Sequence, residues 1–352
     1  MNILITGGCG FIGSSLAVAL KSEGHDIICF DNLSRRGSEV IVNRILDHGC
    51  KFIHGDIRNR EDFIKIKQQC EIMIECSAEP SVLVGSQGAE AMFMVENNLF
   101  GAVNCFEYSR MHHISVIFIS TSRVYPYDVL NSFRYKENET RYEYSDQRVG
   151  ISSDGIGIDF PLQGFRSLYG ATKLSAEYLL QEYSQNFNIP CLINRCGVVA
   201  GPWQLGKADQ GVFTFWLLNH FFKRNLQYIG FGGQGKQVRD LLHISDLCTL
   251  ITAQISGISK YRGQIFNVGG GRRSNLSLIE TTSLCEKITG TRLEITPILS
   301  ERPADVLWYI TDNSKTVQEF NWNIDKEPIA ILNDTYTWLL ENERLLKNVL
   351  KG

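Results

Sequence analysis

Three glycines near the start of the chain, Gly7, Gly10 and Gly13, constrain its fold more than any other feature. They lie between apolar runs at residues 3–5 and 16–20, a pattern that predicts a buried strand, a tight turn and the opening of a helix. Gly7 permits a turn that other residues adopt only with strain. Gly10 lets a pyrophosphate approach the backbone, and Gly13 lets the helix pack closely on the strand. The free N–H groups at the helix start would then bind the phosphates.

A second strand, predicted over residues 25–31, ends at an acid. Asp31 follows Gly13 by 18 residues, where a carboxylate is placed to accept hydrogen bonds from the adenosine ribose. A glycine triplet alone is weak evidence, because any tight strand–helix turn can use one. Together with the strand, the helix and the acid it predicts a dinucleotide site, to which Phe11 and Ile12 of the same turn also belong.

The polar loop after Asp31 bears on which dinucleotide is bound. Asn32, Ser34 and Arg35 are expected to curl over the adenosine. Arg35 and Arg36 have two interpretations: they meet a 2′-phosphate, which would indicate NADP, or they stack on the adenine beside NAD. Because the Asp31 carboxylate would repel a 2′-phosphate, we expect NAD.

A third strand, predicted at residues 51–54, leads to Asp56 and Ile57 at its carboxyl end. Asp56 there either accepts a hydrogen bond from the adenine amino group or caps a helix predicted at 60–69. Both residues are therefore candidates for the cofactor site.

The next strands complete the predicted sheet. A strand at 71–76 leads to Ser77, a small residue suited to lie along the pyrophosphate and the nicotinamide ribose. A helical pattern at 88–110 precedes the continuous apolar run 114–119, which is typical of a strand buried on both faces. Strands that alternate with helices in this way predict an α/β fold with a doubly wound parallel (Rossmann) sheet and ligands at the carboxyl ends of its strands.

In the second half of the chain, strand and helix patterns no longer alternate regularly. We expect residues 1–193, with about 237–268, to form the Rossmann domain, and 194–236 with 269–352 to form a smaller C-terminal substrate lobe. Residues 127–166 are polar and poorly periodic, and so long an irregular stretch is unusual unless it is functional.

A hydroxyl, a phenol and an ammonium are candidates for the chemistry. Tyr169 and Lys173 are four residues apart in a predicted helix and therefore share one face. The ammonium is expected to lower the pKa of the phenol from about 10. Thr121, at the end of a strand, can donate a hydrogen bond to a reacting oxygen. Alone, the Tyr/Lys spacing also fits an ordinary surface pair; the glycine turn upstream favours a catalytic centre.

Composition excludes several classes of function. With a net charge of −3, the chain lacks the basic composition typical of nucleic-acid-binding proteins. No apolar run reaches the ~18 residues of a membrane span. Ten scattered cysteines and seven histidines lack the spacing of a metal site. We expect a reduced, cytoplasmic protein without metal.

These residues resemble the extended short-chain dehydrogenase/reductase superfamily, and within it the nucleotide-sugar epimerases of the CDP-paratose (CDP-tyvelose) 2-epimerase group. The motifs that carry the resemblance are Gly7-x-x-Gly10-x-x-Gly13, Asp31-Asn32-Leu33, Gly55-Asp56-Ile57, Ser120-Thr121-Ser122, Tyr169-x-x-x-Lys173 and Val238-Arg239-Asp240. The resemblance implies tightly held NAD, no nucleic-acid or membrane partner, and a homodimer or homotetramer built on helices near 88–110 and 168–187. It also implies a role in the biosynthesis of surface polysaccharide.

The resemblance assigns roles as well. Thr121, Tyr169 and Lys173 take the positions of the catalytic triad, with Tyr169 and Lys173 also touching the cofactor. Ser122, Arg239 and Arg302 match substrate-binding positions, although the two arginines are also compatible with surface ion pairs.

The implied reaction is inversion at C2 of a CDP-activated (deoxy)hexose through a transient 2-keto sugar. A 4-epimerase of UDP- or CDP-hexoses is the nearest alternative, followed by a nucleotide-sugar 4,6-dehydratase and a non-catalytic NAD-binding protein. In the dehydratases an Asp-Glu pair follows the triad threonine; here Ser122 and Arg123 stand there, and neither replaces that acid and base.

Overall fold

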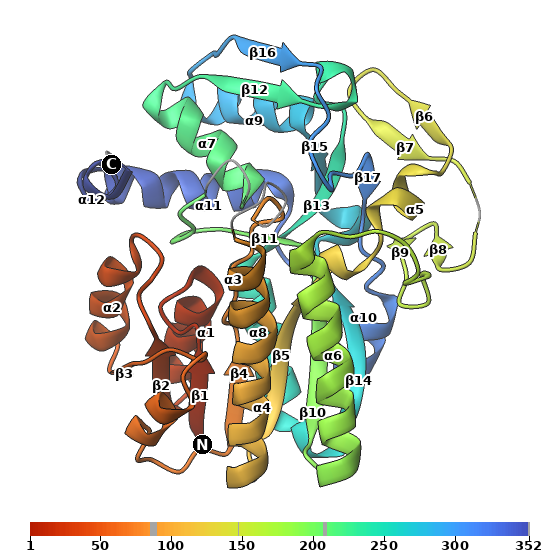
Figure 1. Cartoon of the computed structure of the whole chain (residues 1–352). Coiled ribbons are helices and arrows are strands. Elements are labelled where there is room, and N and C mark those ends of the chain that lie inside the picture. Colours follow the sequence, from red (N-terminus) through yellow and green to blue (C-terminus); the bar gives the residue numbers. More distant parts are fainter. Residues whose placement is uncertain (85–89, 147, 207–209, 351–352) are drawn as a thin grey trace.

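A parallel sheet of seven strands forms the base of the molecule in the computed structural model, which describes residues 1–84, 90–146, 148–206 and 210–350 (Figure 1). Its strands, in spatial order, are β3 (Lys51–His54), β2 (Asp26–Asp31), β1 (Asn2–Thr6), β4 (Ile72–Glu75), β5 (Ser115–Thr121), β10 (Cys191–Cys196) and β14 (Arg262–Val268). The direction in which successive strands are added changes between β1 and β4, which is the doubly wound arrangement predicted from the sequence.

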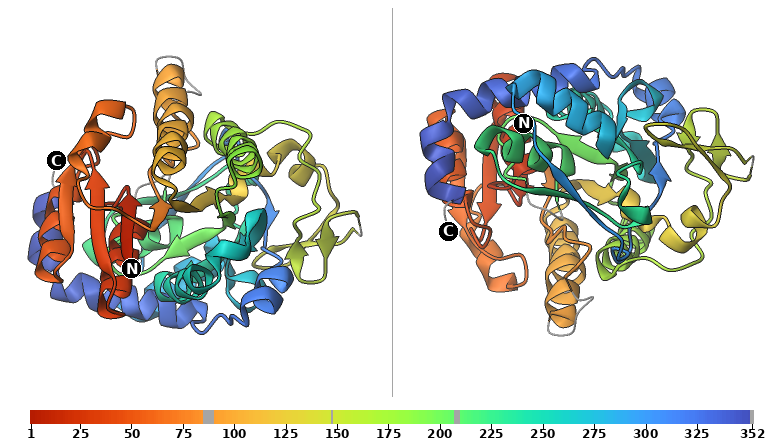
Figure 2. Two further views of the ribbon diagram at one scale, coloured as in Figure 1. Left: turned by 90° about the horizontal axis from the view of Figure 1, so that it is seen from below. Right: turned by 90° about the horizontal axis from the view of Figure 1, so that it is seen from above.

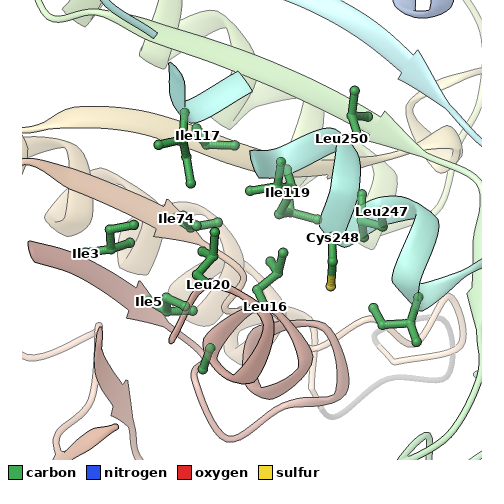
Figure 3. Packing of buried hydrophobic residues seen from close by; sticks show 14 of the residues in the cluster. Ile3, Ile5, Leu16, Leu20, Ile74, Ile117, Ile119, Leu247, Cys248 and Leu250 are labelled. Carbon is green, nitrogen blue, oxygen red and sulfur yellow. The ribbon is translucent and has the colours of Figure 1, made fainter. Parts of the chain in front are cut away.

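Helices cover both faces of this sheet (Figure 2). On one face lie α1 (Phe11–Ser22), α2 (Ser38–Asp47), α8 (Ile244–Ser256) and α10 (Ser314–Phe320); on the other lie α3 (Ala91–Val95), α4 (Gly101–His112) and α6 (Leu168–Phe187). Successive strand residues point to opposite faces, so Ile3 and Ile5 pack against α1 and α8 (Figure 3). Leu4 packs toward α4 and α6 on the other face. The apolar runs of the sequence are thus buried on both sides.

A smaller lobe lies over the carboxyl ends of the strands (Figure 1). Its sheets join β11 (Val198–Ala200), β13 (Val238–His243), β15 (Asn275–Ser277) and β17 (Trp308–Tyr309), and, separately, β12 (Leu226–Ile229) with β16 (Ile295–Ile298). Its helices are α7 (Val212–Phe222), α9 (Leu278–Thr289), α11 (Pro328–Glu341) and α12 (Glu343–Leu350). The structure differs from the predicted division at β13, which pairs within the lobe although α8 and β14 after it return to the large sheet.

The stretch 127–166 contains short ordered elements at the side of the molecule. They are α5 (Tyr127–Asn131) and two hairpins, β6 (Tyr135–Glu137) with β7 (Tyr142–Tyr144), and β8 (Ile151–Ser152) with β9 (Gly155–Ile156). Arg141 of the first hairpin pairs with Glu280 of α9, and Lys236 before β13 pairs with Glu137. These contacts between distant segments hold the stretch against the lobe, which local sequence periodicity does not reveal.

One predicted helix is wrong. Residues 60–69 form only a 3₁₀ turn over Arg60–Lys65, because Ile66 is already extended. The side chain of Asn59, not that of Asp56, accepts the capping hydrogen bond at its start. Among the described helices, none is both long and apolar enough to cross a membrane.

Candidate active site

The carboxyl ends of β1, β2, β4, β5 and β10 open into one cavity beneath the lobe, which encloses about 1630 Å³ including space open to solvent. We call it the strand-end cavity. The sequence-predicted residues that line it are Gly7, Gly10, Phe11, Ile12, Gly13, Asp31, Asn32, Ser34, Arg35, Ile57, Ser77, Thr121, Ser122, Tyr169 and Lys173. Residues up to 166 positions apart are therefore brought together, as the ends of parallel strands require.

The glycine turn has the geometry of a phosphate cradle. Gly7 has a positive φ of 65°, and its carbonyl accepts a hydrogen bond from Gly10 N–H at 2.9 Å. A Cβ on Gly13 would lie 2.2 Å from that carbonyl oxygen, so only glycine fits there. Helix α1 begins next to Gly10 with no side chain capping its N–H groups. The turn therefore fits a dinucleotide pyrophosphate, which would take the place of a cap.

Asp31 ties the glycine turn to the loop that follows β2. Its two carboxylate oxygens accept N–H groups from Cys9 at 2.9 Å and from Leu33 at 2.8 Å. Burial raises the pKa of Asp31, and these two hydrogen bonds act against that rise. Asp56 is absent from the described lining of the cavity; it accepts hydrogen bonds from Asn32 and Arg58, so it supports the loop from behind.

We predict that the protein, stripped of cofactor, binds NAD at least about tenfold more tightly than NADP, a preference that requires only ~1.4 kcal/mol. The Asp31 carboxylate would repel a 2′-phosphate, and Arg35 already donates to the Leu205 carbonyl at 3.3 Å. Calorimetric titration with both dinucleotides measures this, with Asp31→Asn as the variant expected to reduce the preference. Equal or tighter binding of NADP would mean that Arg35 and Arg36 bind its 2′-phosphate.

The phenol, the ammonium and the hydroxyl meet in the wall of the strand-end cavity. Ser167 caps α6 by accepting the N–H of Gly170, which places Tyr169 in the first turn and Lys173 one turn later. Thr121 ends β5 beside them. Since a helix start carries partial positive charge, it favours the phenolate of Tyr169.

The Lys173 ammonium lowers the pKa of Tyr169 as predicted, but burial decides the net direction. Burial raises the pKa of Tyr169, and this outweighs the Lys173 ammonium and the hydrogen bond with Thr121, both of which lower it. Neither the depth of the phenol nor the charge beside Lys173 can be read from local sequence.

That charge belongs to Glu75, a residue that sequence reasoning missed. Its carboxylate lies 3.2 Å from the Lys173 ammonium, and both side chains are buried. Only its position at the end of a predicted strand marked it in the sequence, because its partner is 98 residues away.

A second cavity of about 1270 Å³, the lobe cavity, adjoins the first and is lined by both predicted substrate arginines. Arg239 is buried and pairs with Asp305 at 2.6 Å, while Arg302 lies on the same wall. Arg123, which sequence reasoning had treated only as a missing base, lines both cavities and donates to the Ala304 carbonyl at 3.0 Å. Arg123, Arg239 and Arg302 thus all line the lobe cavity, where their guanidinium groups can bind a diphosphate.

The arrangement combines a dinucleotide cradle with an acid–base pair in one cavity. It is suited to oxidation and reduction of an alcohol on a ligand that carries phosphates. Within the described ranges, no group of three or more His, Cys, Asp or Glu side chains is placed to hold a metal ion.

Comparisons with known proteins identify relatives of this chain. The model of the NAD dependent epimerase/dehydratase family matches residues 3–269. The chain is 31% identical to the CDP-paratose 2-epimerase of Salmonella typhi, over 96% of this chain and 99% of that protein. It is 26% identical to a UDP-glucose 4-epimerase of Neisseria meningitidis, over 97% and 98%. The crystal structure of a Bacillus cereus UDP-glucuronic acid 4-epimerase with UDP-glucuronic acid and NAD matches with a TM-score of 0.79 at 26% identity, covering 97% of this chain and 99% of that one.

Proposed function

Because this chain belongs to the NAD dependent epimerase/dehydratase family, a family of nucleotide-sugar enzymes whose cofactor is NAD, we propose that it inverts C2 of a CDP-activated deoxyhexose. The similarity to a CDP-paratose 2-epimerase over almost the full length of both chains carries the choice of carbon and nucleotide. A UDP- or CDP-hexose 4-epimerase is the second candidate, supported by relatives of lower identity and using the same site residues.

The residues in the wall of the strand-end cavity divide the work of this reaction. Tyr169, as phenolate, takes the proton of the C2 hydroxyl and returns it after the sugar has presented its other face. Thr121 orients the sugar oxygen, and Lys173 stabilises the phenolate. NAD, when bound against the glycine turn, supplies a hydride acceptor and donor next to this carbon.

The arginines that line the lobe cavity support a diphosphate between sugar and nucleoside. Arg239 and Arg302 would hold it, and Ser122, which lines the strand-end cavity, would lie beside the sugar. Arg123 occupies a position where a dehydratase needs a base, and burial with the charge of Arg239 lowers its pKa only to about 10, so it stays protonated at neutral pH. This favours epimerisation over dehydration.

A panel of CDP-, UDP-, GDP- and dTDP-sugars, with products identified by NMR, tests the proposal. We expect inversion at C2 of a CDP-sugar. Substrate deuterated at C2 should give product that keeps the label, and unlabelled substrate in D₂O should gain none, because the hydrogen leaves and returns as hydride. Solvent deuterium at C2 would contradict this mechanism, whereas inversion at C4 would establish the second candidate instead.

We also propose that the protein acts as a homodimer or homotetramer, in the synthesis of surface polysaccharide. The support for assembly is a set of apolar side chains on the face of α4 and α6 away from the sheet. Phe100 before α4 is 53% exposed, Met111 at its end is 64% exposed, and Phe187 at the end of α6 is 49% exposed. Covering them would remove apolar surface from water.

A further inference from the structure

A buried ion pair underlies the catalytic centre. The Lys173 ammonium lies 3.2 Å from one oxygen of Glu75, and the other oxygen accepts the N–H of Ser77 at 2.8 Å. The side chain of Lys173 is 2% exposed and that of Glu75 is fully buried. Neither charge has access to water, so each depends on the other.

The fold fixes both partners of this pair. Glu75 ends β4, where its backbone is paired with β1 and β5, and Lys173 projects from the second turn of α6. The ring of Phe118 lies 4.4 Å from the ammonium and closes its apolar side. Lys173 therefore lies between Glu75, on β4, and Tyr169, one turn earlier on α6.

Few other charges face this centre. Arg123 contributes a positive charge near Tyr169. Burial raises the pKa of Cys196, which lies near Tyr169, to about 12, and that of Cys76, which lies near Lys173, well above its ordinary value, so both thiols are neutral. Burial alone would lower the pKa of Lys173, but Glu75 and Tyr169 raise it. Glu75 is thus the main negative charge acting on the ammonium.

We propose that Glu75 is a positioning residue of the active site: it holds the Lys173 ammonium in place and cancels part of the charge that Lys173 presents to Tyr169. The proposal rests on the proposed role of Tyr169 as the proton acceptor. An ammonium without a counterion would hold the phenolate strongly and make it a weak base. With Glu75 beside it, Tyr169 binds and releases its proton at higher pH, which suits a group that must take a proton and give it back.

The proton affinity of Tyr169 can be measured without any sugar substrate. Tyrosinate absorbance is followed against pH in NAD-loaded protein, and the signal of the Tyr169→Phe variant is subtracted to isolate Tyr169. Glu75→Gln keeps the shape of the side chain and removes its charge. It should move the midpoint of Tyr169 ionisation to lower pH by about one unit or more, the size expected from one nearby charge. An unchanged or higher midpoint would overturn the proposal.

Glu177→Gln is the matched control. Glu177 lies on α6, the helix that carries Lys173, and is as buried as Glu75, but its partner is Arg195. This variant should therefore lose stability without moving the midpoint of Tyr169 ionisation. If Glu75→Gln does not fold, the double variant Glu75→Gln/Lys173→Met removes both charges together and should fold. Failure of the double variant as well would mean that Glu75 serves packing alone. Since no sugar is used, this result is separate from the outcome of the substrate panel.

Discussion

Replacing Tyr169 by Phe should lower turnover by about 10²–10⁴-fold, the usual effect of losing general base catalysis. The ring stays in place and only the hydroxyl, which we propose takes the substrate proton, is lost. Because burial raises the pKa of Tyr169, activity of the unmodified protein should increase as the pH rises and more phenolate forms. Initial rates with the accepted nucleotide sugar, measured across pH, give both quantities.

Tyr178→Phe is the control for this variant. Tyr178 lies on the same helix but is 52% exposed and lines neither cavity among the described residues. It should keep full turnover, and both variants should keep their NAD and their melting temperature. Wild-type turnover in Tyr169→Phe would place the chemistry elsewhere.

Arg195→Met should lower the free energy of unfolding by about 3–5 kcal/mol, the cost of leaving a buried charge without its partner. Arg195 is 2% exposed and makes bonds of 2.7 and 3.0 Å to one oxygen of Glu177, which is fully buried. After the substitution, the carboxylate keeps the hydroxyl of Ser120 at 2.5 Å but no opposite charge. Urea unfolding followed by fluorescence measures the loss.

An exposed pair provides the comparison for this loss. Lys21 and Asp26 lie 3.1 Å apart, but the Asp26 side chain is 65% exposed, so Lys21→Met should cost less than about 1 kcal/mol. The double variant Arg195→Met/Glu177→Gln should recover much of the stability, since it removes both buried charges. A small loss in Arg195→Met would show that water reaches this pair.

Features that depend on neighbours in the chain were predictable from the sequence. The turn between β1 and α1 follows from glycines three residues apart, and the shared face of Tyr169 and Lys173 follows from the pitch of a helix. Alternation of apolar strands and helices was enough to predict the doubly wound sheet, which the strand order confirms.

Features that depend on distant partners were not predictable. Residues 60–69 carry a helical pattern, yet the chain turns back at Ile66 to pack against the sheet. From the sequence we assign residues 237–268 to the Rossmann domain, but β13 pairs with β11, β15 and β17, which come from both sides of α8 and β14. Glu75 is unremarkable in the sequence, and only the packing of α6 against the sheet brings Lys173 to the end of β4.

Two separate segments of the chain, one before β14 and one after it, form the lobe, and this sets the order in which its strands are synthesised. β12 and β13 are made before β14, but their partners β16, β15 and β17 are made after it. A nascent chain that has just completed the large sheet therefore carries unpaired strand edges and the apolar face of α7, both of which promote association with other chains. These pairings span long sequence separations, so the lobe closes late and slowly. Arg239 and Arg302, the arginines proposed to bind substrate, come from the two sides of β14 and can line one cavity only after β14 has been made.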